Sequence, residues 1–189
     1  MTGVQTCALP IFVTDAFQFN GQTEILFEGV LSKVLANQNK RRALLWGVSS
    51  VLEATLSSTV KFNASISYTQ GRILNTGGNG SPLDHIPPTY GRVGLRWQPQ
   101  KYGLEGFILF NGQKRIEDYL LNGEDNEQYA PANGIPAWMT VNIRGHVNIY
   151  KGIKLQAGVE NIFDTQYRVF ASGINSPGRN VYVCLRGAF

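Results

Sequence analysis

The stretch WMTVNIRGHVNIYKGIKLQAGVE, residues 138–160, decides the fold of this chain. Apolar and polar residues alternate through both of its halves, and Lys151 and Gly152 separate the halves. A period of two places one kind of residue on each face of a β-strand, whereas a helix repeats every ~3.6 residues. We therefore predict two strands, 138–149 and 153–161, joined by a tight turn.

The same alternation recurs along the chain and is followed by a regular pattern of links. The further predicted strands are 42–56, 59–69, 90–97, 103–112 and 180–189, with a possible stub at 12–17. Short links at 57–58, 98–101 and 151–152 alternate with long links rich in Gly, Pro and Asn at 70–89, 113–137 and 162–179. An up-and-down transmembrane β-barrel has short turns at one end and long loops at the other. A strict alternation of short and long links is not expected in a soluble sandwich. A soluble β-rich binding module nevertheless stays open as the alternative.

One face of the predicted sheet is too polar to be a packed core. Its charged residues are Lys61, Arg92, Arg96, Glu105, Arg144, Lys154, Glu160 and Arg186. Burying unpaired charges costs several kcal/mol each, so this face is expected to meet water. The other face then meets a core or lipid, and no helix or second sheet is predicted to cover it. In a barrel, Arg92, Arg96, Arg144, Glu160 and Arg186 would face the lumen.

Composition narrows the possible classes of function. Charged residues make up 16% of the chain, against roughly 25% in a soluble domain, and no apolar run reaches the ~18 residues of a spanning helix. Lys and Arg are dispersed, so the net charge of +4 does not indicate nucleic-acid binding. Cys7 and Cys184 have no metal-ligand spacing around them. We expect no metal, no cofactor and no disulfide framework.

The placement of the aromatic residues supports a membrane barrel only in part. Trp97 and Tyr102 flank a short link on the apolar parity, and Trp46 and Tyr68 lie toward the long links. This placement is typical of the two interfacial girdles of a membrane barrel. Other aromatics fall on the polar parity: Tyr90, Trp138 and Tyr150. Ordinary core positions remain the alternative for the girdle residues.

The first eleven residues, MTGVQTCALPI, look foreign to the rest. They lack the charged and apolar regions of an export signal, and VQTCALPI resembles one reading frame of a short-read sequencing adapter. We expect residues 1–11 to be an artefact and 12–189 to be the natural segment. A genuine loop is the alternative.

Three segments carry a family resemblance: PLDHIPPTYGRVGL (82–95), GEDNEQYAPANGIPAW (123–138) and GVENIFDTQYRVFASGINSPGRNVYVCLRGAF (158–189). They resemble the C-terminal end of TonB-dependent outer-membrane receptors, especially the Bacteroidetes type. The resemblance implies a barrel of about 22 strands in the outer membrane of a Gram-negative cell. It also implies TonB-driven uptake of a scarce ligand, such as a ferric siderophore, cobalamin or an oligosaccharide.

The resemblance also sets expectations for partners. The receptor would contact outer-membrane lipid, the TonB complex through a plug domain that this chain lacks, and the barrel-assembly machinery through a last strand ending in Phe189. We expect 12–189 to be an inactive C-terminal fragment that forms an open sheet of about seven or eight strands. Strands 42–56 and 179–189 would lie at its unpaired edges. In 180–189 the odd residues would face lipid, and Cys184 would be a small wall residue on the lumen side.

Catalytic chemistry has little support. Asp84 and His85 are adjacent in a proline-stiffened loop, and Ser81 lies too close in sequence to suggest a triad. An outer-membrane barrel enzyme such as a lipase is thus a weak alternative, and we expect no enzyme. The better binding candidates lie in or beside the long loops: Arg72, Arg115, Asp118, Tyr119, Glu124, Asp125, Tyr129, Arg168 and Arg179. The alternative is that these residues are solvated or form ion pairs that hold one loop against another.

Overall fold

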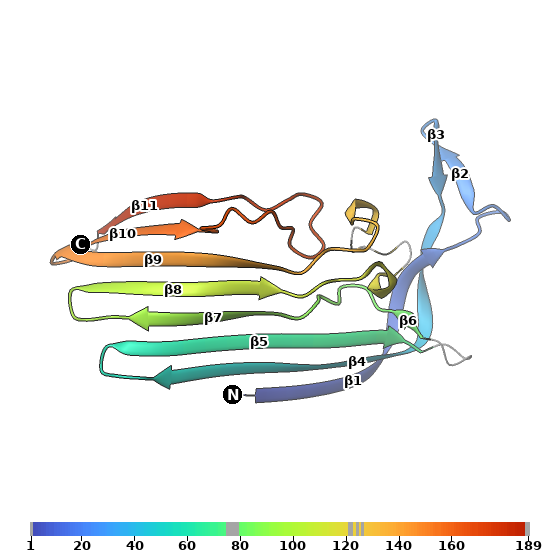
Figure 1. Ribbon diagram of the computed structural model, residues 1–189. Helices are drawn as coiled ribbons and strands as arrows, with labels where there is room; N and C mark the ends of the chain where they lie inside the picture. Colours follow the sequence, from blue (N-terminus) through green and yellow to red (C-terminus); the bar gives the residue numbers. More distant parts are fainter. Residues whose placement is uncertain (1, 75–79, 121–122, 124, 126, 188–189) are drawn as a thin grey trace.

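The computed structural model describes residues 2–74, 80–120, 123, 125 and 127–187, and it forms one antiparallel sheet in sequence order (Figure 1). The main path runs through β1 (Thr2–Ala16), β4 (Leu35–Thr55), β5 (Val60–Ile73), β7 (Tyr90–Trp97), β8 (Tyr102–Asn111), β9 (Trp138–Tyr150), β10 (Ile153–Glu160) and β11 (Asn180–Gly187). A short strand, β6 (Ser81–Pro82), pairs with the end of β5. The prediction of an all-β, antiparallel, open sheet is confirmed.

The links are sorted by length onto the two ends of the sheet. The short turns of residues 56–59, 98–101 and 151–152 lie at one end, and the long loops lie at the other (Figure 1). The loop between β8 and β9 holds two short 3-10 helices, η1 (Ile116–Asp118) and η2 (Glu127–Tyr129). The predicted alternation of short and long links is therefore present in the fold.

The start of the sheet differs from the prediction. Strand β4 begins at Leu35 rather than at residue 42, and β1 pairs along it, so the edges are β1 and β11. Alternation did not reveal this extension because residues 37–42 are polar on both parities. The register of β1 shifts between Leu9 and Ile11, around a proline that has no N–H to donate. The interpretation of residues 1–11 as foreign stays a prediction.

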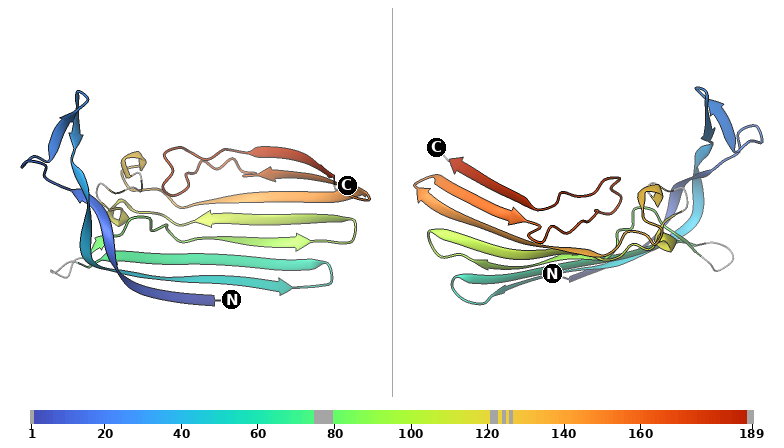
Figure 2. Two further views of the ribbon diagram at one scale, coloured as in Figure 1. Left: turned by 180° about the vertical axis from the view of Figure 1, so that it is seen from behind. Right: turned by 45° about the horizontal axis from the view of Figure 1, so that its top comes forward.

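A hairpin that the sequence pattern did not reveal stands out from the long-loop end. It consists of β2 (Glu24–Phe27) and β3 (Val30–Lys33), which pair only with each other (Figures 1 and 2). Its turn residues Glu28 and Gly29 have φ angles of 48° and 81°, the left-handed values that a tight two-residue hairpin needs. Each strand of this hairpin is only four residues long, which is too short to give a periodic signal.

The sheet is curved and open, and no layer formed by the described residues covers its apolar face (Figure 2). Ile66, Leu95, Leu104, Val183 and Leu185 on that face are all exposed. The buried apolar cluster is small, with Ala43 and Ile73 packed against Leu83 and Leu120 at the long-loop end. None of the helical segments in the described ranges has the length and apolar character needed for a membrane crossing.

Candidate functional site: a charged wall and a loop layer

The polar face of the sheet, here called the wall, is organised around one carboxylate. Register places Glu105 of β8 opposite Arg96 of β7 and opposite Arg144 of β9. Its oxygens accept hydrogen bonds from Arg92 Nη2 at 2.7 Å, Arg96 Nη2 at 3.2 Å and Arg144 Nε at 2.6 Å. The Glu105 side chain is 5% exposed. One acid thus holds three guanidinium groups, and the wall keeps a positive charge.

An aromatic ring stiffens this arrangement. The guanidinium carbons of Arg92 and Arg144 lie 4.4 and 5.2 Å from the centre of the Phe107 ring, which shares the polar face. Arg92 also donates to the side-chain oxygen of Asn63 on β5. Cation–π contacts of this kind are worth about 0.5–2 kcal/mol. The arginine side chains are therefore fixed in direction rather than free to turn into water.

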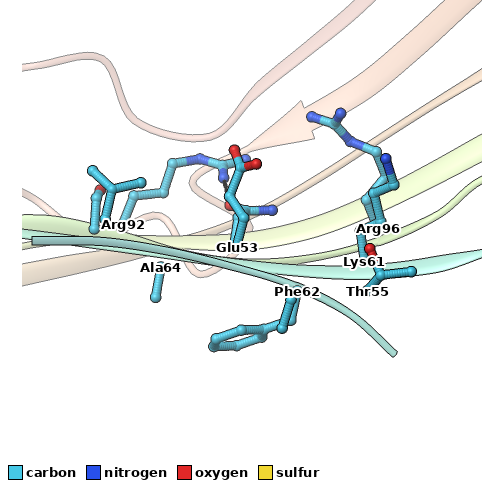
Figure 3. Close-up of a pocket in the computed structure, with 11 residues that line it drawn as sticks. Glu53, Thr55, Lys61, Phe62, Ala64, Arg92 and Arg96 are labelled. Atoms are coloured by element: carbon cyan, nitrogen blue, oxygen red, sulfur yellow. Dashed lines mark hydrogen bonds between the residues drawn. The ribbon is translucent and has the colours of Figure 1, made fainter. Parts of the chain in front are cut away.

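Two hollows lie on the wall beside this cluster. The first, of about 480 Å³, lies over β4, β5 and β7, and its lining includes Glu53, Lys61, Arg92 and Arg96. Figure 3 shows these side chains on one side of the strands and Phe62 and Ala64 on the other. The second hollow, of about 370 Å³, has this ionisable lining: Arg96, Glu105, Arg144, His146, Lys154 and Arg186. We call this second one the basic hollow.

The long loops at one end of the sheet, here called the loop layer, contain a buried ion pair. Lys114 Nζ lies 3.9 Å from Asp125 Oδ2, and the two side chains are 4% and 1% exposed. Lys114 donates to the carbonyl oxygen of Ile86 at 2.6 Å, and its ammonium group lies over the rings of Tyr119 and Phe170. The backbone N–H of His85 donates to Asp125 Oδ1 at 3.0 Å. These contacts join all three long loops.

Burial governs ionisation in this layer. Desolvation raises the pKa of Asp125, against the hydrogen bond from His85, and lowers the pKa of Lys114, against the nearby carboxylates. Desolvation also raises the pKa of Tyr119 to about 12. Among the described residues, the buried Tyr119 hydroxyl has no hydrogen-bond partner. Asp125 and Tyr119 therefore belong to the buried interior of the loop layer in this structure.

A second, more exposed ion-pair group joins the end of β5 to η1. Asp118 lies between Arg72, at 4.0 Å, and Arg115, whose Nε donates to it at 3.2 Å. Arg115 Nη1 also lies 2.8 Å from Glu117 Oε1. The hydrogen bond to Asp118 raises the pKa of Arg115. Two cations and two acids leave this group close to neutral.

The motif residues of 158–189 tie the last loop to the sheet. Asn161 donates its backbone N–H to Asn142 Oδ1. Its side-chain Nδ2 donates to the carbonyl of Thr165, and its Oδ1 accepts the N–H of Thr165, both at 2.9 Å. Asp164 Oδ1 accepts the backbone N–H of Arg179 at 2.7 Å, so the loop ends meet. Trp138 Nε1 donates to the Arg168 carbonyl at 3.0 Å. The NIFD and PGRN signatures are thus explained by loop closure.

The predicted loop candidates do not form one common site. Arg72, Arg115 and Asp118 come together, whereas Asp125 and Tyr119 are buried. Arg168 donates to the carbonyl of Tyr129, whose side chain is 55% exposed. Glu124, like Phe189, lies outside the described residues. As ligand contacts, all of these residues, including Arg179, stay predictions.

Of the predicted wall residues, Arg92, Arg96 and Arg144 converge on Glu105, whereas Glu160 and Arg186 lie on other parts of the same face. Glu160 Oε2 accepts a 3.5 Å hydrogen bond from Asn180. Sequence reasoning gave no role to Lys114 and did not single out Glu105 as the common partner. The pairing of Glu105 with Arg144 crosses a long loop, and the pairing of Lys114 with Asp125 forms within one, so no local spacing signals either.

Comparisons with known proteins agree on the architecture. The family described as "TonB dependent receptor-like, beta-barrel" matches residues 14–162. The copper transporter OprC superposes with a TM-score of 0.71 at 17% identity, covering 98% of this chain and 29% of that one. A mutant ferric enterobactin receptor (PfeA) from Pseudomonas aeruginosa, in complex with enterobactin, gives 0.65 at 17% identity, covering 100% and 29%. The chain spans less than a third of these structures, and no curated protein matches it.

Proposed function

We propose a function that starts from one established premise: the chain belongs to the TonB-dependent receptor β-barrel family. The chain would form part of the barrel of an outer-membrane receptor that takes up a scarce ligand by active transport. The apolar face of its sheet would contact lipid, and the wall would line the lumen. The single observation that carries this proposal is the family match over residues 14–162, on a sheet with one charged and one apolar face.

The lipid-facing assignment rests on the physics of exposed surfaces. The apolar face carries exposed aliphatic side chains on β4, β5, β7, β8, β9 and β11, a patch that a water-soluble surface would rarely expose. The aromatic pairs Trp97–Tyr102 and Trp46–Tyr68, with ring centres 5.6 and 5.3 Å apart, lie toward the short-turn and long-loop ends of that face. Aromatic pairs at both borders are typical of interfacial girdles.

We further propose that this chain is part of a longer receptor. The outer edges of β1 and β11 are unpaired within the described sheet, and open sheet edges are not viable within a bilayer. Further strands must therefore close the barrel. The TonB complex, a plug domain and the barrel-assembly machinery would be partners of that receptor, and the Bacteroidetes type remains our proposal from the loop motifs.

The ligand class proposed for the receptor is a small molecule, such as a ferric siderophore, cobalamin or an oligosaccharide. Its contacts would come from the exposed loop candidates Arg72, Arg115 and Tyr129 and from the half-buried Arg168. An enzyme is not proposed, because the backbone N–H and the ring of His85 contact the buried Asp125 of the loop layer.

Cell fractionation tests this function. The complete gene product that contains this chain should sediment with the outer membrane on a density gradient and resist extraction by carbonate. A strain without the TonB complex should retain the receptor in that fraction and lose uptake of its ligand. Recovery of the complete protein in the soluble periplasm would overturn the proposal.

A further inference from the structure

The apolar face of the sheet has a hollow of its own, on the side opposite the basic hollow. It has a volume of about 400 Å³ and lies over β8, β9, β10 and β11. Gly145 of β9 and Ala157 of β10 are directly opposite each other, and their small size makes them its floor. Register places larger aliphatic side chains around this floor: Leu104, Ile143, Val147, Leu155, Val159 and Val183. We call this feature the apolar hollow.

The apolar hollow lies on the outer surface of the proposed barrel. The strands that complete a barrel extend the sheet sideways, past β1 and β11, and leave its outer face uncovered. A plug would fill the lumen, on the face that carries the wall. The side chains of Leu104 and Val183, which are 45% and 70% exposed, are therefore expected to stay open to lipid in the complete receptor.

The apolar hollow has a defined depth in the membrane. Leu104 and Gly145 are directly opposite each other, two residues along β8 from Tyr102. A strand rises about 3.3 Å per residue, so this step is about 7 Å along the strand. Tyr102 pairs with Trp97 at the short-turn border, and aromatic residues of a girdle lie at the level of the lipid headgroups. The hollow thus faces the first part of the acyl chains in the adjacent leaflet.

Two cations lie at the same border. Lys101 directly precedes Tyr102 in one short turn, and Lys151 lies in the next short turn along the sheet. Both residues are exposed. The carbonyl of Lys101 accepts the backbone N–H of Asn148 at 2.8 Å, so the two turns are neighbours. An apolar hollow below the border and two cations at the border match the two chemical parts of an anionic phospholipid.

We propose that the apolar hollow binds an acyl chain of a phospholipid whose anionic headgroup is held by Lys101 and Lys151. The proposal rests on the proposed function, because a membrane barrel presents this face to lipid. The raised aliphatic rim contacts an acyl chain on its sides as well as from beneath, whereas a flat face contacts it from beneath alone. The bound phospholipid should therefore stay with the receptor when detergent removes the bulk bilayer.

Native mass spectrometry of the complete receptor in detergent tests the hollow, with phosphatidylglycerol as the probe and phosphatidylcholine as its zwitterionic counterpart. The wild type should retain one phosphatidylglycerol and bind it more tightly than phosphatidylcholine. Ala157→Ile fills the hollow from an exposed strand position. It should weaken retention of both lipids about tenfold, as expected when about two methylene groups lose their burial.

The matched control is Ala64→Ile, which makes the same change on β5, on the side opposite the charged residues (Figure 3) and outside the hollow. It should leave retention unchanged. Equal retention by Ala157→Ile and Ala64→Ile would overturn the proposal, since the hollow would then not hold the lipid.

Lys101→Gln and Lys151→Gln test the headgroup contact without altering a strand. Each should lower retention of phosphatidylglycerol about fivefold and leave retention of phosphatidylcholine unchanged. Equal retention of the two lipids by the wild type would overturn the proposal, because the two lysines would then have no headgroup to hold.

A protein occupant would give a different result in the same spectra. If the hollow packs against a second copy of the receptor, the wild type should appear as a dimer that Ala157→Ile dissociates, and that result would also overturn the lipid site.

Failure of this proposal can be told apart from failure of the proposed function. A receptor that fractionates with the outer membrane, needs TonB for uptake and retains neither phospholipid would sink the lipid site alone. A protein recovered in the soluble periplasm would sink both.

Discussion

The wall and the loop layer handle charge in opposite ways. On the wall, Glu105 is shared by three arginines that remain partly exposed, so water and neighbouring donors soften the loss of any one contact. In the loop layer, Lys114 and Asp125 are almost fully buried and pair with each other at 3.9 Å. The sheet tolerates an excess of charge on a water-facing surface, whereas the packing of the loops depends on a balanced ion pair.

The largest effect should come from breaking the buried pair. Lys114→Met leaves the Asp125 carboxylate buried without its cation, which costs about 3–5 kcal/mol. Hydrogen exchange of the complete receptor should show the 112–137 and 82–89 segments losing protection while the strands keep theirs. Lys151→Met, in an exposed short turn, is the control and should change nothing. Unchanged exchange in both loops would show that the pair does not hold the layer.

Alkaline pH should weaken the same layer through Tyr119. Its pKa is about 12 in the fold and 10 in the unfolded chain, so its stabilising contribution is intact below about pH 10 and is lost as the pH rises toward about 12. The difference amounts to about 3 kcal/mol. Loop protection measured between these pH values should therefore fall in the wild type and fall less in Tyr119→Phe.

Tyr129→Phe serves as the control for that titration because the Tyr129 side chain is exposed. It should follow the wild type. If Tyr119→Phe and wild type lose protection equally across this range, ionisation of another group opens the layer.

Removing the shared acid of the wall should have a smaller effect. Glu105→Gln leaves the three arginines without a carboxylate, but they stay partly hydrated, so we expect a loss of about 2 kcal/mol. Urea unfolding of the complete receptor, followed by heat-modified mobility in gels, measures this change. Glu53→Gln on the same face is the matched substitution and should cost less, and an equal cost for both would argue against the shared role of Glu105.

The smallest effect is expected at the lipid border. Trp97→Ala removes one ring of the Trp97–Tyr102 pair, worth about 0.5–1.5 kcal/mol beyond the area that it buries. The loss should be seen in bilayers and reduced in detergent, since the girdle acts at the membrane interface. An effect of the same size in both environments would indicate ordinary packing.

Much of the sheet could be predicted from the sequence because one physical signal repeats in it. Alternation at 138–149 and 153–161 identified the two strands and the faces of Arg144 and Lys154, and link lengths identified which end carries the loops. The β2–β3 hairpin and the extension of β4 were missed. The first is too short for a period, and the second is polar on both faces.

The candidate sites depended on registers that local sequence does not contain. Arg92 and Arg96 reach Glu105 through a short turn, but the partnership with Arg144 crosses a 26-residue loop between β8 and β9. Lys114 and Asp125 belong to one loop, and residues of the two other long loops, His85 and Phe170, pack against them. Charged loop residues could be found by composition, but whether each is exposed or buried is decided by this packing.

The most direct test of the central claim is a scan of accessibility along β11 in the complete receptor within its membrane. Spin labels would be placed one at a time from 180 to 186, in a background in which Cys7, Cys184 and any other cysteine of the receptor are replaced by Ser. We predict a period of two, with labels at Val181, Val183 and Leu185 exposed to dissolved oxygen in lipid and labels at Tyr182 and Arg186 exposed to a water-soluble nickel complex. Equal accessibility to both reagents along the strand, or the reverse alternation, would contradict the account.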